Sequence, residues 1–180
     1  EMVCMLGPNG CGKSTLLRTL AGLQPPLAGT YEVQGLSSEK ASENSAERAK
    51  HLALVLTERL SLEHTTVHDV VAMGRYPYSS FLGGLSAEDE EVIADALQRV
   101  GLQDMADTYF NNHSDGEKQR ILIAKALAQQ TPVILLDEPT AHLDLPNRIR
   151  TLQLLRHLAH EQGKTILIST HELDLALQLS

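Results

Sequence analysis

The sequence predicts an α/β fold with a largely parallel sheet. Three observations indicate this class: strand-like and helix-like patterns alternate, two strands are continuous apolar runs, and a glycine-rich turn joins the first strand to a helix. Continuous apolar runs are typical of parallel strands, because helices cover such strands on both faces. Alternating strands and helices favour the crossover connections that parallel strands require.

The composition bounds the class of protein. The 180 residues suffice for one domain with a hydrophobic core, and 42% hydrophobic residues exclude wholesale disorder. The net charge of −8 and the lack of a Lys/Arg-rich run argue against nucleic acid as a partner. No apolar run approaches the ~18 residues of a membrane span. Two cysteines, Cys4 and Cys11, indicate a reducing compartment.

Four segments have the pattern of strands in the main sheet. They are Met2–Leu6, which we expect to be buried, and residues 51–56, 133–137 and 165–169. A turn-rich piece at residues 25–29 precedes residues 30–33, which we expect in an antiparallel flank. Residues 37–47 are polar and low in complexity, and we interpret them as loop or exposed helix without chemistry.

Three later segments have the pattern of helices. Ser86 and Asp89 form a capping box for a helix that stops at Gly101. Its acidic residues 88–91 suit the positive end of the helix dipole, and a metal or partner site there is the alternative. A second helix begins near Ser114, and a third runs from Pro146 to Gly163. The sequence begins with Glu and stops inside an apolar periodic stretch, so we expect a piece of a longer protein, truncated at both ends.

Residues 7–14, GPNGCGKS, fit the phosphate-binding pattern G-x-x-x-x-G-K-[ST]. The motif follows a strand and opens a helix at 14–20, where backbone N–H groups and the helix N-terminus attract phosphate. We expect Lys13 to act catalytically by neutralising the β- and γ-phosphates, and the Ser14 hydroxyl to bind Mg²⁺. The expected nucleotide-binding residues here are Gly7, Pro8, Asn9, Gly10, Cys11, Gly12, Lys13, Ser14 and Thr15.

A buried strand at 133–137 ends in two carboxylates, Asp137 and Glu138. The carboxyl ends of parallel strands share one crevice, so we expect both groups beside the phosphate loop. Asp137 is expected to hold Mg²⁺, and Glu138 to orient or deprotonate the attacking water. The chain is therefore predicted to be a P-loop NTPase that hydrolyses its nucleotide.

Further motifs resemble those of one family of P-loop proteins. Residues 112–120 (NHSDGEKQR) resemble the signature of ABC-type ATPases, 137–144 (DEPTAHLD) their second acidic motif and D-loop, and 168–171 (ISTH) their switch histidine. The motifs arrive in family order and span nearly the whole chain. The resemblance implies a single ABC ATPase domain: a RecA-like core at 1–60 and 130–180, a partial antiparallel β flank, and an α-helical subdomain with the signature helix at about 61–129.

The family pattern also implies site residues. Ser114, Gly116 and Asp144 would contact ATP bound to a second copy, in a head-to-tail nucleotide sandwich. His171 would act catalytically at the γ-phosphate, although an isolated histidine is ambiguous. Glu58 stands nearest to the family's Q-loop glutamine, and its carboxylate would bind nucleotide and Mg²⁺.

The signature departs from the family pattern at three positions, and its serine has a second interpretation. His113, Asp115 and Glu117 replace the usual leucine, glycine and glutamine. Ser114 and Glu117 also form a plain capping box, so cap and anion site are both open for Ser114.

Residues 66–78 resemble ATPases of iron-siderophore, haem and cobalamin importers. This resemblance implies an ATP- and Mg²⁺-dependent subunit at the cytoplasmic face of the inner membrane. Its partners would be a second copy, integral membrane permease subunits and, indirectly, a substrate-binding protein. Aromatic residues of the helical part suit either a partner groove or core packing; among them are Tyr76, Tyr78, Phe81 and Phe110.

Three alternatives follow from the same motifs. The first is a soluble ABC ATPase of translation or DNA repair, and the second is a weakly hydrolysing regulatory ABC subunit, which Glu58 leaves open. An unrelated P-loop kinase or GTPase is the third. It would lack the signature, and a GTPase would need an Asn-Lys-x-Asp motif that the sequence does not contain.

Overall fold

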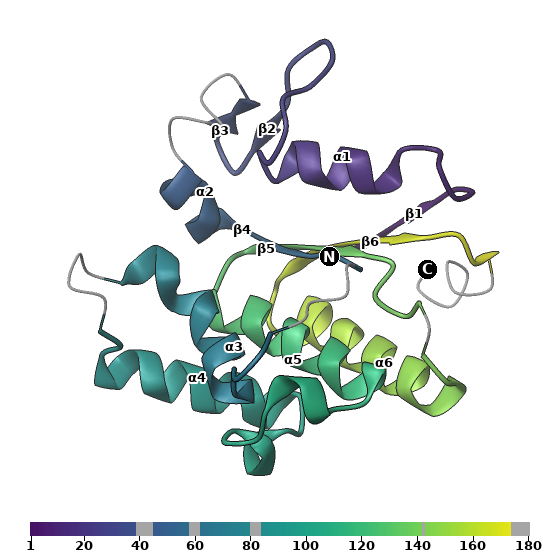
Figure 1. The fold of residues 1–180 in the computed structure, drawn as a ribbon. Coiled ribbons are helices and arrows are strands. Elements are labelled where there is room, and N and C mark those ends of the chain that lie inside the picture. Colours follow the sequence, from purple (N-terminus) through teal and green to yellow (C-terminus); the bar gives the residue numbers. More distant parts are fainter. Residues whose placement is uncertain (39–44, 58–61, 80–83, 142, 174–180) are drawn as a thin grey trace.

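The computed structural model describes residues 1–38, 45–57, 62–79, 84–141 and 143–173. Their centre is a four-stranded sheet with the order β1-β6-β5-β4, in which every neighbouring pair is parallel (Figure 1). The strands are β1 (Met2–Leu6), β4 (Leu52–Val55), β5 (Val133–Asp137) and β6 (Thr165–Thr170). The expected parallel sheet is therefore confirmed.

Helices cover both faces of this sheet (Figure 1). One face carries α1 (Lys13–Leu20), beside the antiparallel pair of β2 (Glu32–Val33) and β3 (Leu36–Ser37). A short helix, α2 (Ser45–His51), leads into β4. The other face carries α3 (Val67–Ala72), α4 (Ala87–Arg99), α5 (Asp115–Ala128) and α6 (Leu145–Glu161). Within the described residues, three 3₁₀ turns lie between these helices: η2 (Met73–Tyr78), η3 (Gln103–Met105) and η4 (Phe110–Asn112).

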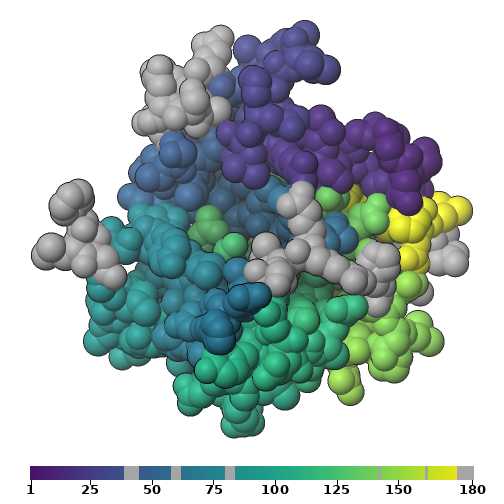
Figure 2. All heavy atoms as spheres, in the orientation of Figure 1, coloured from purple at the N-terminus to yellow at the C-terminus, as the bar shows by residue number. Residues whose placement is uncertain are grey.

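The two faces of the sheet bury two separate apolar clusters. On β5, Ile134 and Leu136 point into the large cluster shared with α3 to α6, whereas Val133 and Leu135 point towards Leu17 of α1. Successive side chains of a strand alternate between faces, so a continuous apolar run serves both clusters. In the space-filling view, the residues of the helical part, coloured teal to green, lie together below the purple N-terminal residues (Figure 2).

Two strand predictions were wrong in detail. We expected Met2–Leu6 to be buried, but β1 is an edge strand on which Val3 is 42% and Leu6 47% exposed. We expected a strand from residue 51, but His51 ends α2, where its ring contacts the Glu47 carboxylate one turn earlier. The strand therefore begins at Leu52.

Helices α4, α5 and α6 each begin directly after a residue whose side chain caps the helix N-terminus. Ser86 with Asp89, and Ser114 with Glu117, form complete capping boxes for α4 and α5, as expected. Helix α6 starts at Leu145, one residue before the expected Pro146, because Asp144 caps it. The flank strand is shorter than predicted, and part of the polar segment 37–47 belongs to β3 and α2.

Some predictions fall on residues outside the described ranges. These are Glu58, Phe81, residues 39–44 of the polar segment and the apolar stretch at 174–180. Among the described aromatic residues, Phe110 is 1% exposed and belongs to the core, while Tyr76 is 65% exposed. No helix within the described part of the chain is both long enough and apolar enough to span a bilayer.

Candidate functional site

The carboxyl ends of the four parallel strands meet at one edge of the sheet. Thr57 follows β4, Asp137 ends β5, Thr170 ends β6 and Gly7 follows β1. The Gly7 N–H donates to the carbonyl oxygen of Thr170 over 3.1 Å, which fastens the start of the phosphate loop to β6. Because β6 lies between β1 and β5, its last residues bridge the loop and the acidic pair.

The phosphate loop has the backbone that its glycines permit. Gly10 and Gly12 have φ values of 81° and 100°, in the left-handed region that residues with a Cβ rarely adopt. Lys13 is 7% exposed, and its Nζ donates to the carbonyl oxygens of Gly7 (2.8 Å) and Pro8 (3.0 Å). The same ammonium lies 3.4 Å from the Glu138 carboxylate. The loop therefore holds a nearly buried cation directly beside the acidic pair.

Asp137 is a buried carboxylate in a fixed orientation. It is 5% exposed, and the Ser169 hydroxyl donates to its Oδ1 over 2.6 Å. Ser169 itself is fully buried on β6, directly across from Asp137 in the strand register. Just beyond the other neighbouring strand, β4, the Thr57 hydroxyl donates to the Asp137 carbonyl oxygen over 2.7 Å. Both adjacent strands thus position this residue.

Glu138 occupies an unusual backbone conformation. Its φ of 44° lies in the left-handed region, which is uncommon for a residue other than glycine. Its N–H lies within hydrogen-bonding distance of two Ser169 acceptors, the carbonyl oxygen at 3.2 Å and Oγ at 3.0 Å. The carboxylate is 3.1 Å from Nδ1 of the exposed His171. The strained turn therefore directs the Glu138 side chain towards both Lys13 and His171.

A hollow of about 420 Å³ opens between the phosphate loop and the acidic pair. Its lining comes from the loop, α1, the end of β4 and the end of β5: Asn9, Gly10, Gly12, Lys13, Ser14, Thr15, Arg18, Thr57, Asp137 and Glu138. The structure brings most of the predicted loop residues together with both predicted carboxylates. The cation, the backbone amides and the helix start suit a polyphosphate.

The donor set also suits Mg²⁺, which proteins bind through one or two carboxylates, hydroxyls, waters and substrate phosphates. Ser14, which has a hydroxyl, and Asp137, which has a carboxylate, both line the hollow. The Ser169 hydroxyl engages Asp137 Oδ1, so Oδ2 is the carboxylate oxygen that would bind the ion. Across the described part of the chain there is no cluster of three or more His, Cys, Asp or Glu side chains that would hold a metal unaided. Phosphate oxygens would have to complete the shell.

Three further predicted residues, Ser114, Gly116 and Asp144, form a second group, which does not line the hollow. Gly116 is buried against α6, where an added Cβ would lie 2.7 Å from Cγ and Nδ2 of Asn147. The Asn147 N–H in turn donates to Asp144 Oδ1 over 3.0 Å. The starts of α5 and α6 therefore meet, and they place the exposed Ser114 and Asp144 at one corner. Gly116 has a packing role that the sequence did not reveal.

The departures in the signature segment build the cap of α5. The Ser114 N–H and hydroxyl donate to the Glu117 carboxylate over 2.9 and 2.8 Å. The Ser114 backbone hydrogen bond, the largest cause, and the hydroxyl lower the pKa of Glu117 below its usual value. His113 adds a contact of 2.8 Å between Nε2 and the Thr108 hydroxyl. The capping interpretation of Ser114 is confirmed, and the anion interpretation stays a prediction.

Sequence reasoning missed three residues of the site. Ser169 had a signal, since it is a polar residue at the end of an otherwise apolar strand and precedes His171 by two positions. Thr57 and Arg18 had none, because their contribution depends on how β4 and α1 reach the same edge. The predicted ligand Glu58 lies outside the described residues.

Comparison with known proteins places this site in a family. The family model described as ABC transporter matches residues 1–141. The iron(3+)-hydroxamate import ATP-binding protein FhuC of Bacillus subtilis is 39% identical over 180 residues, which cover 100% of this chain and 66% of FhuC.

Solved structures agree with the sequence match. The inward-facing structure of a transporter assigned to the metal-chelate type superposes with a TM-score of 0.85 at 33% identity, covering 100% of this chain and 66% of that one. The dimeric structure of the ABC transporter cassette MJ0796 gives 0.85 at 30% identity and covers 98% and 77%. The chain spans 61–66% of the length of the first curated relatives it matches.

Proposed function

Because this chain belongs to the family of ABC transporter ATP-binding proteins, we propose that it hydrolyses ATP to drive a membrane importer. The observation that carries this proposal is the edge where Lys13, Asp137 and Glu138 line one hollow. It combines a phosphate cradle, a metal-binding carboxylate and a second carboxylate placed to activate water. A site that only bound nucleotide would not need the second carboxylate.

The residues of the hollow divide the chemistry between them. The Lys13 ammonium leaves its carbonyl partners for the β- and γ-phosphates of ATP, where it stabilises developing charge. Glu138 then loses its contact with Lys13 and accepts the proton of the attacking water. His171 holds Glu138 in position through Nδ1.

The Mg²⁺ ion, when bound, would neutralise phosphate charge and orient the substrate. Ser14 and Asp137 are the residues that would hold it. Ser169 keeps the Asp137 carboxylate in one orientation, because its hydroxyl donates to Oδ1. Glu58, as a carboxylate close behind Thr57 in the sequence, is proposed as a further ligand of nucleotide and metal.

A complete site needs two copies of the chain. Ser114, Gly116 and Asp144 gather at the joint of α5 and α6, and none of them lines the hollow of its own chain. We propose that this corner closes over the phosphates held by a second copy, in a head-to-tail sandwich. Ser114 would offer its hydroxyl, and the start of α5 its helix dipole, to the γ-phosphate.

The proposed cargo is a metal chelate or cobalamin. Curated relatives are named for siderophore, iron(3+)-hydroxamate and cobalamin transport. The subunit would lie at the cytoplasmic face of the inner membrane, bound to integral permease subunits that a substrate-binding protein supplies. ATP-driven closure of two copies would move the permease, and hydrolysis would reset it.

Steady-state ATP hydrolysis by the full-length subunit tests this proposal. The rate per molecule should rise with protein concentration, because two copies form each site. Glu138→Gln should lower kcat by at least about 100-fold and leave ATP binding intact, since it removes only the general base. Glu91→Gln on the exposed face of α4 is the matched control and should behave as wild type.

Two outcomes would count against the proposal. Wild-type turnover that survives in Glu138→Gln would exclude Glu138 as the base. A rate per molecule that stays constant down to concentrations at which sizing with ATP shows only single chains would exclude the two-copy site.

A further inference from the structure

An ion pair outside the ATP hollow joins α6 to the segment that follows β6. Arg148, in the first turn of α6, donates from Nη1 to Glu172 Oε2 over 2.5 Å. The two side chains are 30% and 28% exposed, so most of each is shielded from water. A fully exposed pair holds its elements weakly because water screens the charges, whereas a short and largely shielded pair holds them more firmly. Neither residue lines the hollow.

Glu172 is placed by the turn that ends β6. Its N–H donates to the hydroxyl of the buried Thr170 over 3.1 Å. The Thr170 carbonyl oxygen accepts the Gly7 N–H, so this residue is also fastened to the phosphate loop. His171 lies between Thr170 and Glu172 in the sequence, and its Nδ1 is 3.1 Å from the Glu138 carboxylate. The histidine therefore stands between a residue fixed to the sheet and a residue fixed to α6.

His171 has less packing around it than the other charged or titratable groups at this edge. Its side chain is 40% exposed, whereas that of Glu138 is 19% and that of Lys13 is 6% exposed. An exposed ring keeps a fixed contact only when its backbone is held, because few neighbouring atoms restrain the side chain itself. The pair of Arg148 and Glu172 supplies such a restraint one residue beyond the histidine.

The Arg148 end of the pair is anchored in the corner where α5 meets α6. The Arg148 N–H donates to the Asp144 carbonyl oxygen over 2.9 Å, and Asp144 Oδ1 accepts the Asn147 N–H. Asn147 in turn packs against Gly116. Backbone hydrogen bonds make this first turn stiff, so Arg148 is fixed relative to the residues proposed to meet the second copy. One helix thus carries both that corner and the anchor of His171.

We propose that Arg148 is a positioning residue for ATP hydrolysis, which acts through Glu172 to hold His171 beside Glu138. This inference rests on the proposed function and adds a residue to it. Because Arg148 does not line the hollow, it should affect the rate of hydrolysis and leave the affinity for ATP unchanged. The members of the pair lie 24 positions apart, so local spacing in the sequence does not reveal it.

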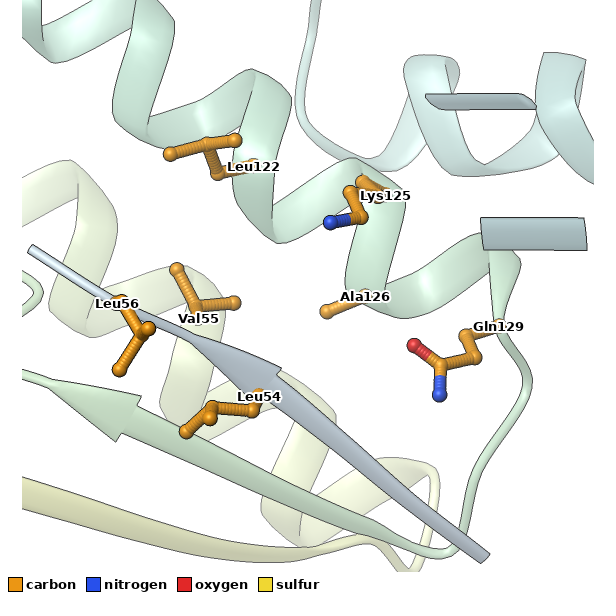
Figure 3. Close-up of a pocket in the computed structure, with 7 residues that line it drawn as sticks. All are labelled: Leu54, Val55, Leu56, Leu122, Lys125, Ala126 and Gln129. Atoms are coloured by element: carbon orange, nitrogen blue, oxygen red, sulfur yellow. The ribbon is translucent and has the colours of Figure 1, made fainter. Parts of the chain in front are cut away.

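The pair is separate from the place where α5 meets β4. A pocket of about 130 Å³ lies there, with Val55 of the strand and Leu122 of the helix in its lining (Figure 3). Arg148 does not line this pocket. Substitution of Arg148 should therefore leave hydrogen exchange unchanged in residues 52–56 and 122–129, which verifies that an altered rate does not come from a loosened fold.

Kinetics of the full-length subunit test the proposal. Arg148→Gln should lower kcat about tenfold and change the KM for ATP less than about twofold, because the histidine is displaced while the phosphate cradle is not. Arg148→Lys should keep at least about a third of the wild-type kcat, since an ammonium can still pair with Glu172. Arg150→Gln removes the same charge from an exposed residue of the same helix and should behave as wild type.

Charge exchange separates positioning from general stability. Arg148→Glu should lower kcat about tenfold or more, and adding Glu172→Arg should restore it to within about threefold of wild type. Active-site titration with ATP gives the rate per folded molecule, so partial unfolding of a variant does not imitate the effect. The proposal is overturned if Arg148→Gln has the wild-type kcat per folded molecule, if its KM rises as much as its kcat falls, or if the double exchange recovers nothing over Arg148→Glu.

The wild-type rate, measured in the same series, separates this inference from the function on which it rests. If the wild-type subunit hydrolyses ATP and Arg148→Gln is equally fast, only the positioning by Arg148 is wrong. If wild-type protein binds ATP without hydrolysing it even with its membrane subunits, the proposed function is wrong, and this inference falls with it.

Discussion

At the scale of single residues, Ser169 decides how the acidic pair is arranged. Its hydroxyl donates to Asp137 Oδ1, and the Glu138 N–H points to its oxygens. A fully buried hydroxyl between two carboxylate residues can orient them through hydrogen bonds, which an apolar residue cannot do. We regard Ser169 as a positioning residue, since it contacts Asp137 and Glu138 and does not line the hollow.

Ser169→Ala should therefore reduce activity through Asp137. Loss of a hydrogen bond to a charged group costs about 1.5–3 kcal/mol, so kcat should fall roughly tenfold to 100-fold. The Mg²⁺ concentration for half-maximal activity should rise as well, because Asp137 would hold the ion less firmly. Ser79→Ala, which removes an exposed hydroxyl that donates to the Tyr76 carbonyl oxygen and does not line the hollow, is the control. If Ser169→Ala needs the same Mg²⁺ concentration for half-maximal activity as wild type, Ser169 does not position Asp137 for the ion and only stabilises the fold.

At the scale of elements, a buried ion pair joins η2 to α4 and α5. Arg75 is 5% exposed, donates to Asp89 Oδ1 over 2.7 Å and to the Ala128 carbonyl oxygen over 2.8 Å, and stacks on the Tyr78 ring at 4.2 Å. Asp89 also closes the capping box of α4. The Ser86 N–H, then Arg75 and the Ser86 hydroxyl, lower the pKa of Asp89 from 3.8 to about 2.

This pKa predicts how stability depends on pH. Because the pKa of Asp89 is lower in the folded state, its ionised carboxylate stabilises the fold at pH values above the unfolded-state pKa of 3.8. This stabilisation is lost as the pH falls from about 4 to 2. Asp89→Asn should lower the free energy of unfolding by roughly 2 kcal/mol at pH 7, and the difference from wild type should shrink over that acid range.

Urea unfolding followed by circular dichroism at several pH values measures both quantities, since the chain has no tryptophan. The control is Asp95→Asn on the same helix, whose carboxylate is 55% exposed and pairs with Arg99 across one turn. It should change stability by less than about 0.5 kcal/mol. A difference between Asp89→Asn and wild type that persists unchanged to pH 2.5 would contradict the proposed charge interaction.

At the scale of the whole molecule, polar contacts at the end of α5 tie the helical part to the core. Gln129, just after α5, spans this joint, because its Nε2 donates to the carbonyl oxygens of Ala49 in α2 and Leu52 in β4. The apolar packing of α5 on the sheet supplies the rest of the joint. A movement of the helical part relative to the core would have to strain or break these two hydrogen bonds.

Gln129→Ala should loosen that joint. The substitution leaves two carbonyl oxygens without this donor, so the free energy of unfolding should fall by about 1–3 kcal/mol. Hydrogen exchange should quicken in α3 to α5 before it quickens in β5 and β6, because the helical part would open first. Gln103→Ala in the exposed η3 turn is the matched control. Equal acceleration in both parts would mean that Gln129 does not separate them.

The sequence by itself determined the features that depend on neighbouring residues. The phosphate loop, the strand that ends in Asp137 and Glu138, and the caps at Ser86 and Ser114 each lie within a few positions, so local spacing specifies them. The parallel sheet followed from the continuous apolar runs. Most of the hollow's lining was therefore predictable from the sequence alone.

Only the tertiary structure decided which distant residues share a place. The strand order β1-β6-β5-β4 puts Ser169 and Thr57 on either side of Asp137 and makes β1 an exposed edge strand. The packing of α5 joins Gly116 to Asn147 and turns Lys125 towards β4. Such contacts arise when helices and strands pack as whole units, and the pattern of any one segment contains no information about the order in which the others lie beside it.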